Sequence, residues 1–109
     1  MTKKLLSPIH PGEILLEEFL KPAHITQAKL ASCIKVPVSQ INKVCQGQRG
    51  ITPDLALRLA FYFNMGSEGM KFWMNLQHNY EFRVALDFLR EKAVEIRKQV
   101  SSLPPPKNP

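Results

Sequence analysis

Several features are scarce in this 109-residue sequence, and each shortage excludes a class of protein. Its 2 cysteines, Cys33 and Cys45, are too few for a disulfide framework, and neither has a second Cys or a His at zinc-ligand spacing. Pro8, Pro11 and Gly12 interrupt the N-terminal leucines, which argues against a signal peptide, and no apolar run approaches the ~20 residues of a membrane span. We therefore expect a soluble, cytoplasmic protein without a membrane partner, in which both cysteines are small, buried side chains in a reducing compartment.

Clusters that could carry out chemistry are equally scarce. The 3 histidines, His10, His24 and His78, lie in separate segments, and the sequence has no glycine-rich phosphate loop. Each histidine is better interpreted as a hydrogen-bonded or surface side chain. Trp73 and Tyr80 lie at helical spacing on an apolar face, which is more typical of a core than of a base-stacking platform. The sequence therefore predicts no enzyme, no cofactor and no metal site.

Acidic residues are also few. The chain has 15 Lys and Arg against 9 Asp and Glu, a net charge of +6, which suits a polyanionic partner. The excess is concentrated in the middle of the chain. Between positions 21 and 71 there are basic residues at 21, 29, 35, 43, 49, 58 and 71 and acids at 54 and 68.

The apolar pattern predicts an all-α chain without strands, organised as one compact domain. We expect an N-terminal arm over residues 1–10, a five-helix domain over 11–80, a long C-terminal helix over 81–100 and a disordered proline-rich tail over 101–109. Local signals are expected to delimit the five helices: Pro11 and Pro22 for the first, Thr26 for the second, Pro37 and Gly47 for the third, Thr52-Pro53-Asp54 and Gly66 for the fourth, and Ser67 as the cap of the fifth.

Residues 27–46 fit the geometry of a helix-turn-helix motif, in which two helices cross through a short turn. Ala31 supplies the small residue that the crossing requires, and Val36 supplies an apolar plug for the turn Lys35-Val36-Pro37. Ile41 and Val44, three positions apart, anchor the second helix. A plain helical hairpin could imitate part of this pattern, but seldom both the alanine and the plugged turn.

The outer face of the helix that follows Pro37 is polar and carries no acid. At ~100° per residue, burial of Ile41 and Val44 turns Ser39, Asn42, Lys43 and Gln46 outward, with Val38 and Gln40 beside them. These residues, with Gln27 and Arg49, are our candidate DNA-binding residues. Lys43 is the expected base or phosphate contact, whereas Gln40, Gln46 and Arg49 suit backbone contacts. The alternative for each residue is an idle position in solvent.

Taken together, HPGEIL, EEFL, LA…VP…IN.V..G, RGIT.D.ALRLA and FW.NLQ..Y resemble the HigA-type antitoxins, also called virulence-associated protein I or plasmid-maintenance antidote, a branch of the Cro/C1-like helix-turn-helix family. The resemblance covers about residues 8–82. It implies a five-helix, lambda-repressor-like DNA-binding domain and a homodimer on a palindromic double-stranded DNA operator. It also implies repression of the protein's own operon and neutralisation of a RelE/HigB-like toxin that cleaves messenger RNA.

The resemblance also assigns roles to particular residues. Gln27 matches the family's phosphate-contacting glutamine, and Val38, Ser39 and Lys43 match its base-reading positions. Lys35 departs from the family, because it stands where the turn usually has glycine. If this position needs a positive φ, lysine costs about 1 kcal/mol more than glycine.

The predicted C-terminal helix supports a second function, that of a protein-interaction module. Its apolar residues are spaced by four and three positions like a heptad seam: Phe82, Leu86, Leu89, Ala93, Ile96 and Val100. The seam could pack on the domain, pair with its own copy or receive a toxin. A membrane-surface helix is the weaker interpretation, because Asp87, Glu91 and Glu95 dilute the positive charge.

Overall fold

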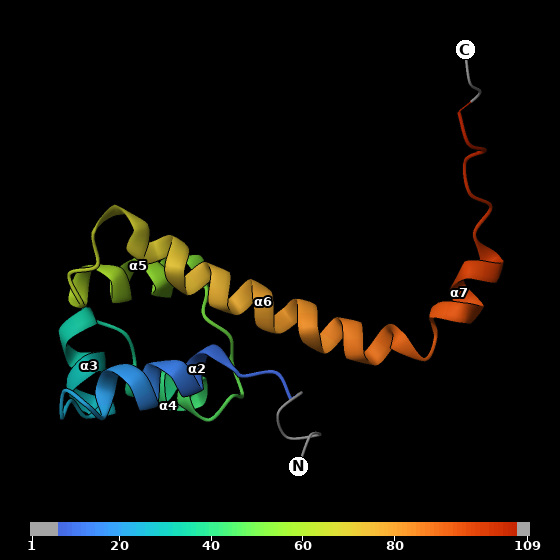
Figure 1. Cartoon of the computed structure of the whole chain (residues 1–109). Helices are drawn as coiled ribbons and strands as arrows, with labels where there is room; N and C mark the ends of the chain where they lie inside the picture. The colour runs from blue at the N-terminus through green and yellow to red at the C-terminus, as the bar shows by residue number, and fades with distance from the viewer. Residues whose placement is uncertain (1–6, 107–109) are drawn as a thin grey trace.

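The computed structural model describes residues 7–106, and every regular element among them is helical, as the sequence predicts (Figure 1). In chain order the elements are α2 (Pro11–Ile14), η1 (Leu15–Leu20), α3 (Gln27–Ile34), α4 (Val38–Cys45), α5 (Pro53–Tyr62), η2 (Gly66–Glu68), α6 (Gly69–Arg90) and α7 (Ala93–Gln99). The predicted arm and tail are described only over residues 7–10 and 101–106, which form no regular element; residues 1–6 and 107–109 lie outside the described residues.

The first predicted helix comprises α2 and the π-helical turn η1, which continues it. His10 caps it, because its Nδ1 accepts a hydrogen bond of 2.8 Å from the N–H of Gly12. A π turn holds more residues than an α turn. Leu15 and Leu20, five positions apart, are therefore both buried in the core.

Helices α2 to α5 and the first half of α6 enclose one hydrophobic core. Its fully buried members include Leu15, Leu30, Ile41, Leu55, Leu59 and Trp73. The Trp73 ring lies 4.9 Å from that of Phe19 and 5.1 Å from that of Phe72, centroid to centroid, and its Nε1–H donates to Met65 Sδ at 3.2 Å. The prediction that Trp73 belongs to the core is therefore confirmed.

The helix-turn-helix motif folds as its apolar spacing predicts. Thr26 caps α3 by accepting a hydrogen bond of 3.0 Å from the N–H of Lys29. Ala31 is buried in the core, and Val36 in the turn is half-buried against it. Lys35 adopts the left-handed conformation, with φ 63° and ψ 46°. This position therefore has the positive φ at which lysine is less stable than glycine.

Helix α5 begins as predicted but ends earlier. Thr52 caps it by accepting from the N–H of Leu55, and Pro53 fills its first turn. The helix ends at Tyr62, and Asn64, with φ 53°, is the first left-handed residue after its end; Gly66, with φ 74°, follows two residues later. Ser67 was wrongly predicted to cap the next helix. It lies in the short 3-10 turn η2, and α6 begins at Gly69 without a side-chain cap.

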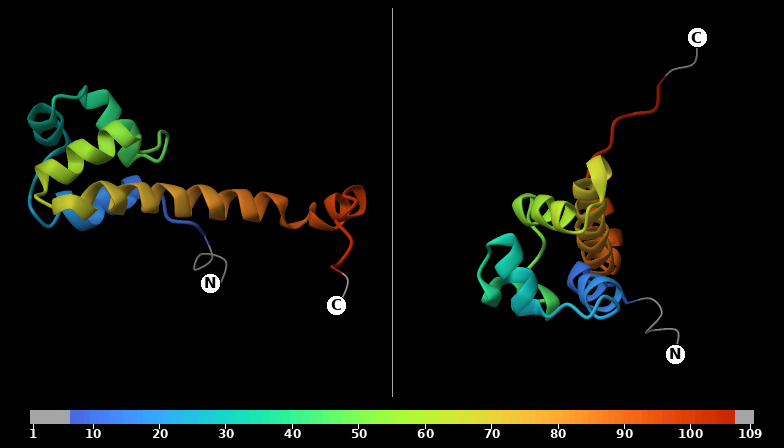
Figure 2. Two further views of the ribbon diagram at one scale, coloured as in Figure 1. Left: turned by 90° about the horizontal axis from the view of Figure 1, so that it is seen from above. Right: turned by 90° about the vertical axis from the view of Figure 1, so that its left-hand side faces the viewer.

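The fifth helix and the predicted C-terminal helix do not part at residue 80. Helix α6 runs unbroken from Gly69 to Arg90 and extends beyond the globular part of the molecule (Figures 1 and 2). The chain turns at Glu91 and Lys92, and α7 leaves in another direction. The expected single helix over 81–100 is therefore wrong, and its apolar seam is divided between two helices. No helix within residues 7–106 combines the length and the apolar character needed to cross a membrane.

One expectation about the cysteines also fails. Cys33 is exposed, because it lies to one side of the face of α3 that buries Leu30, Ala31 and Ile34. Cys45 is half-buried against the core, and this burial raises the pKa of its thiol to about 11. Both thiols are free.

Candidate nucleic-acid interface

Helix α4 is fixed from the inside by two side chains and one backbone contact. Ile41 and Val44 are both 0% exposed. At the end of the helix, α2 approaches so closely that a Cβ on Gly12 would collide with the carbonyl group of Val44. A side chain at position 12 would push the helix away, so glycine sets the position of the C-terminal end of α4.

The turn before α4 is held by an arginine from a third helix. Arg58 Nη1 donates 2.8 Å to the carbonyl oxygen of Ile34, the last residue of α3, while its Nε donates 2.8 Å to Asp54. A charged donor on a helix-end carbonyl stabilises that end, because it satisfies an acceptor and opposes the helix dipole. Arg58, one of the basic residues counted around the motif, is thus engaged within the fold.

The outward face of α4 is open. Val38 is 44% exposed, and Ser39, Lys43 and Gln46 are exposed as well. Gln40 and Asn42 are half-buried at its flanks. The helix carries no acid, and its first turn lacks a side-chain cap because Pro37 holds that position. Its N-terminal N–H groups can therefore bind an anion such as a phosphate.

The two other candidates lie on either side of α4 in sequence. Gln27 is half-buried at the first position of α3, directly after the Thr26 cap. Arg49 is exposed in the loop from residue 46 to 52 that joins α4 to α5. The candidate residues thus belong to the start of α3, to α4 and to the loop after it.

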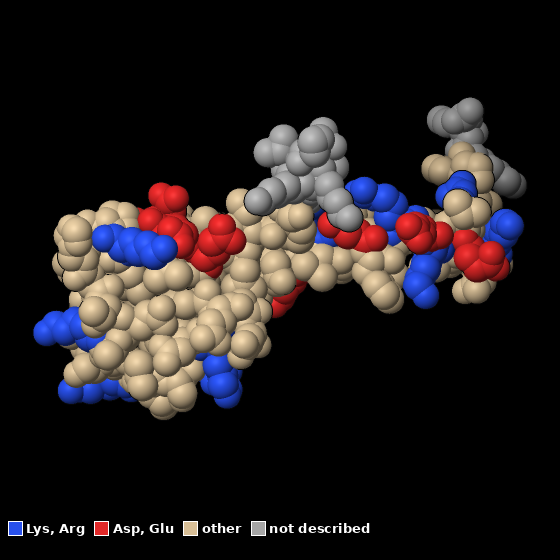
Figure 3. Space-filling model, turned by 90° about the horizontal axis from the view of Figure 1, so that it is seen from below, with Lys and Arg blue, Asp and Glu red and all other residues tan. Residues whose placement is uncertain are grey.

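Charge is distributed differently over the two parts of the molecule. In Figure 3 acidic and basic atoms alternate along the rod formed by α6 and α7. On the globular part, the acidic atoms in that view gather toward one edge, while basic side chains project from several others. Glu13, Glu17 and Glu18 all lie on α2 and η1, and α3 and α4 contain no acid. The surface around the motif therefore suits a polyanion.

Gln77 is a buried residue for which the sequence predicted no role. Its side chain is only 8% exposed, and its amide bonds to the loop that carries Arg49. The sequence did contain one indication that Gln77 is buried. Gln77 follows Trp73 by four positions, so it places a polar group within an apolar stripe of the helix. Among residues 7–106 no group of three or more His, Cys, Asp or Glu side chains could hold a metal ion.

Comparison with known proteins identifies relatives of this architecture. No protein-family model matches the chain. It is 43% identical over 83 residues, covering 76% of this chain and 74% of the relative, to virulence-associated protein I of Dichelobacter nodosus. The structure of PA4674 from Pseudomonas aeruginosa in complex with its 18-bp operator DNA matches with a TM-score of 0.76 and 39% identity, over 90% of this chain and 97% of that one.

A further solved structure, that of the Pseudomonas aeruginosa antitoxin HigA with the higBA promoter, matches with a TM-score of 0.76 and 40% identity, over 88% of this chain and 98% of that one. The similarity thus extends over most of both chains and includes the helix-turn-helix motif. The chain therefore belongs to the HigA-type family of antitoxins, the virulence-associated protein I branch of the Cro/C1-like helix-turn-helix regulators.

Proposed function

We propose that this protein is a sequence-specific DNA-binding repressor that acts as the antitoxin of a type II toxin–antitoxin module and represses its own operon. The observation that carries the proposal is the open, acid-free face of α4, held outward by Ile41 and Val44. Relatives of 39 and 40% identity have been solved with operator and promoter DNA, which supports the same role here. Its relatives are antitoxins and transcription regulators, and the chain is not an enzyme.

In the proposed complex, each protomer inserts α4 into a major groove with its N-terminal half nearest the bases. Val38 and Ser39 are exposed on this half, and Lys43 is exposed on the outward face in the last turn, so we assign the base-edge contacts to these three residues. Side chains around them position the helix through the DNA backbone. These are Gln27, Gln40, Asn42, Gln46 and Arg49. Residues 11–80 thus act as the DNA-binding domain.

The test is a binding titration with the DNA immediately upstream of the protein's own gene. A repressor binds this duplex more tightly than a shuffled duplex of equal composition, and the affinity falls steeply with salt. Arg49→Ala should weaken binding evenly across operator variants and reduce the salt slope by about one. Equal affinity for both duplexes would reject sequence-specific recognition.

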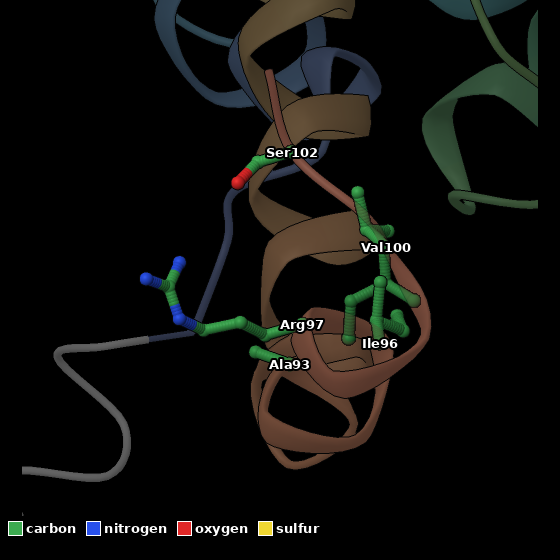
Figure 4. Close-up of a pocket in the computed structure, with 6 residues that line it drawn as sticks. Ala93, Ile96, Arg97, Val100 and Ser102 are labelled. Carbon is green, nitrogen blue, oxygen red and sulfur yellow. The ribbon is translucent and has the colours of Figure 1, made fainter. Parts of the chain in front are cut away.

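A homodimer on a palindromic operator completes the proposal, with the two copies of α4 about 34 Å apart, one turn of DNA. The part of α6 beyond the globule exposes Phe82, Leu86 and Leu89, and we assign the dimer contact to this surface. At the corner between α6 and α7 lies an apolar pocket of about 460 Å³, part of which is drawn in Figure 4. It is lined by Leu89, Ala93, Ile96, Arg97, Val100 and Ser102.

Neutralisation of a RelE/HigB-like toxin is the second half of the proposal. It rests on family membership, since a relative of 29% identity over 94% of the chain is the antitoxin HigA-1 of Vibrio cholerae. Co-expression with the product of the neighbouring gene should yield a complex and suppress that product's cleavage of messenger RNA. If no neighbouring product binds, the exposed α6 and α7 surface favours the alternative, a stand-alone regulator or interaction module.

A further inference from the structure

A single buried amide joins the loop after α4 to helix α6. Gln77 is the only buried polar side chain in the described part of the chain. The N–H of Ile51 donates 2.7 Å to Gln77 Oε1, and Gln77 Nε2 donates 2.9 Å to Glu81 Oε2. The two partners fix the orientation of the amide, because a backbone N–H requires its oxygen and a carboxylate requires its nitrogen.

The loop is shaped to receive this amide. A Cβ on Gly50 would lie 2.8 to 3.0 Å from the nitrogen, oxygen and carbon of the Gln77 amide. A side chain at position 50 would therefore displace the Gln77 amide from its present position. Ile51 is 2% exposed, so its N–H would be left without an acceptor in a dry environment if the oxygen were removed.

The hydrogen bond lies two residues after Arg49. Two backbone hydrogen bonds hold the end of α4. The N–H of Gly47 donates 3.0 Å to the carbonyl oxygen of Val44, and that of Gln48 donates 2.8 Å to the carbonyl oxygen of Lys43. The next N–H along the chain that has an acceptor in the structure is that of Ile51. The backbone of Arg49 and Gly50 thus lies between two hydrogen-bonded residues, Gln48 and Ile51, and Gln77 accepts the bond from Ile51.

We infer that Gln77 is a positioning residue for operator binding, which holds the loop so that Arg49 faces the DNA backbone. This inference rests on the proposed DNA-binding function. It adds a role for a residue that is buried and cannot itself contact DNA. Helix α6 thus positions the loop through Gln77, and the exposed second half of the same helix carries Phe82 and Leu86.

The test is a double-mutant cycle on operator affinity. Gln77→Met removes both hydrogen bonds at similar side-chain length. We expect it to lower affinity by about tenfold and to reduce the salt slope by about one, the same change in slope that is expected of Arg49→Ala. In the Arg49→Ala background, Gln77→Met should have little further effect, because the contact that it positions is already absent. Asn75→Ala, an exposed amide on the same helix, serves as the control and should bind like the wild type.

An exchange of the two side chains provides the rescue. Gln77→Glu alone places two carboxylates at the 2.9 Å contact with Glu81 and should weaken operator binding. The double variant Gln77→Glu/Glu81→Gln again offers an acceptor to Ile51 and a donor–acceptor pair between the two positions, and should recover wild-type affinity.

The outcomes separate this inference from the function beneath it. The positioning role is overturned if Gln77→Met and Arg49→Ala lower affinity additively. It is also overturned if Gln77→Met remains folded with wild-type affinity and salt slope. In both cases the proposed operator binding stands. If Gln77→Met fails to fold, the exchange variants decide, since failure of the double variant to recover affinity overturns the role. If the wild type itself does not prefer its upstream DNA, the proposed function fails first.

Discussion

At the residue scale, the exposed side chains of α4 in the proposed interface are separated from the core by their positions around the helix. Lys43 and Val44 are neighbours in sequence, yet Lys43 is exposed whereas Val44 is 0% exposed. The helical rotation of ~100° per residue produces this contrast. A substitution at Lys43 should therefore change binding without changing the fold, whereas one at Val44 should destabilise the fold and disturb the position of α4.

Lys43→Ala tests base reading. If Lys43 contacts a base edge, its loss should cost about 1–3 kcal/mol of operator binding and relax preference at one base-pair position. Affinities for a set of single-base operator variants measure both effects. Gln48→Ala, an exposed polar residue outside the candidate set, is the matched control. Unchanged affinity in Lys43→Ala would reject its proposed role.

Lys35 tests the strain in the turn. Its φ of 63° is unfavourable for a residue with a Cβ. Lys35→Gly should raise the free energy of unfolding by about 1 kcal/mol. Lys29→Gly, at an exposed position inside α3, should lower it by a similar amount. Chemical denaturation gives both values, and a loss of stability in Lys35→Gly would contradict the assigned strain.

His10 makes stability depend on pH. Burial lowers the pKa of His10 from 6.5, against a smaller opposing effect of Glu13, and the neutral ring accepts the Gly12 hydrogen bond. A lowered folded-state pKa means that this contribution is present above pH 6.5 and is lost as the pH falls through the folded-state value. His10→Asn keeps a capping acceptor and should flatten this part of the stability profile, measured by thermal melts.

The control for His10 is His78→Asn, because His78 is exposed. Its profile should follow that of the wild type. An unchanged acid-side slope in His10→Asn would show that other groups cause the pH dependence.

At the scale of elements, the sequence predicted best what local chemistry decides. Thr26 and Thr52 cap α3 and α5, and the inward spacing of Ile41 and Val44 places α4, because each effect acts within a few residues. The turn at Glu91 and Lys92 contains no glycine or proline, so no local sequence signal predicted a break between two helices there. The bond between Ile51 and Gln77 joins residues 26 positions apart, and only the tertiary fold reveals it.

The crossing of α3 and α4 can be tested at Ala31, which is 3% exposed. Ala31→Glu places a carboxylate where the helices meet and should cost roughly 3 kcal/mol of stability. Ala28→Glu, on the exposed side of the same helix, should be nearly neutral. Melting temperatures compare the two variants. A wild-type melting temperature in Ala31→Glu would refute the tight crossing.

At the scale of the whole molecule, a compact DNA-binding unit carries an extended C-terminal arm made of the second half of α6 and of α7 (Figures 1 and 2). The arm leaves the large apolar side chains of Phe82, Leu86 and Leu89 exposed. A second copy that covers this surface would place two α4 helices in one complex. The dimer and the operator contact are therefore linked in the proposal.

Leu89→Glu tests this link. Leu89 is 42% exposed, and a charge there should disfavour a dimer formed through the arm. We expect a monomer in light scattering and an operator affinity at least about tenfold lower, since two half-sites are no longer bound together. Val84→Glu, equally exposed at 41% on another face of α6, should remain dimeric. A dimeric Leu89→Glu would move the interface elsewhere.

The most direct test of the central claim is an NMR titration of the isotope-labelled protein with its own upstream DNA. We predict that the largest amide shifts fall on Val38, Ser39, Lys43 and Arg49, and that they saturate at one protomer per half-site. Tight binding that leaves the α4 amides unchanged and perturbs another surface would contradict the account.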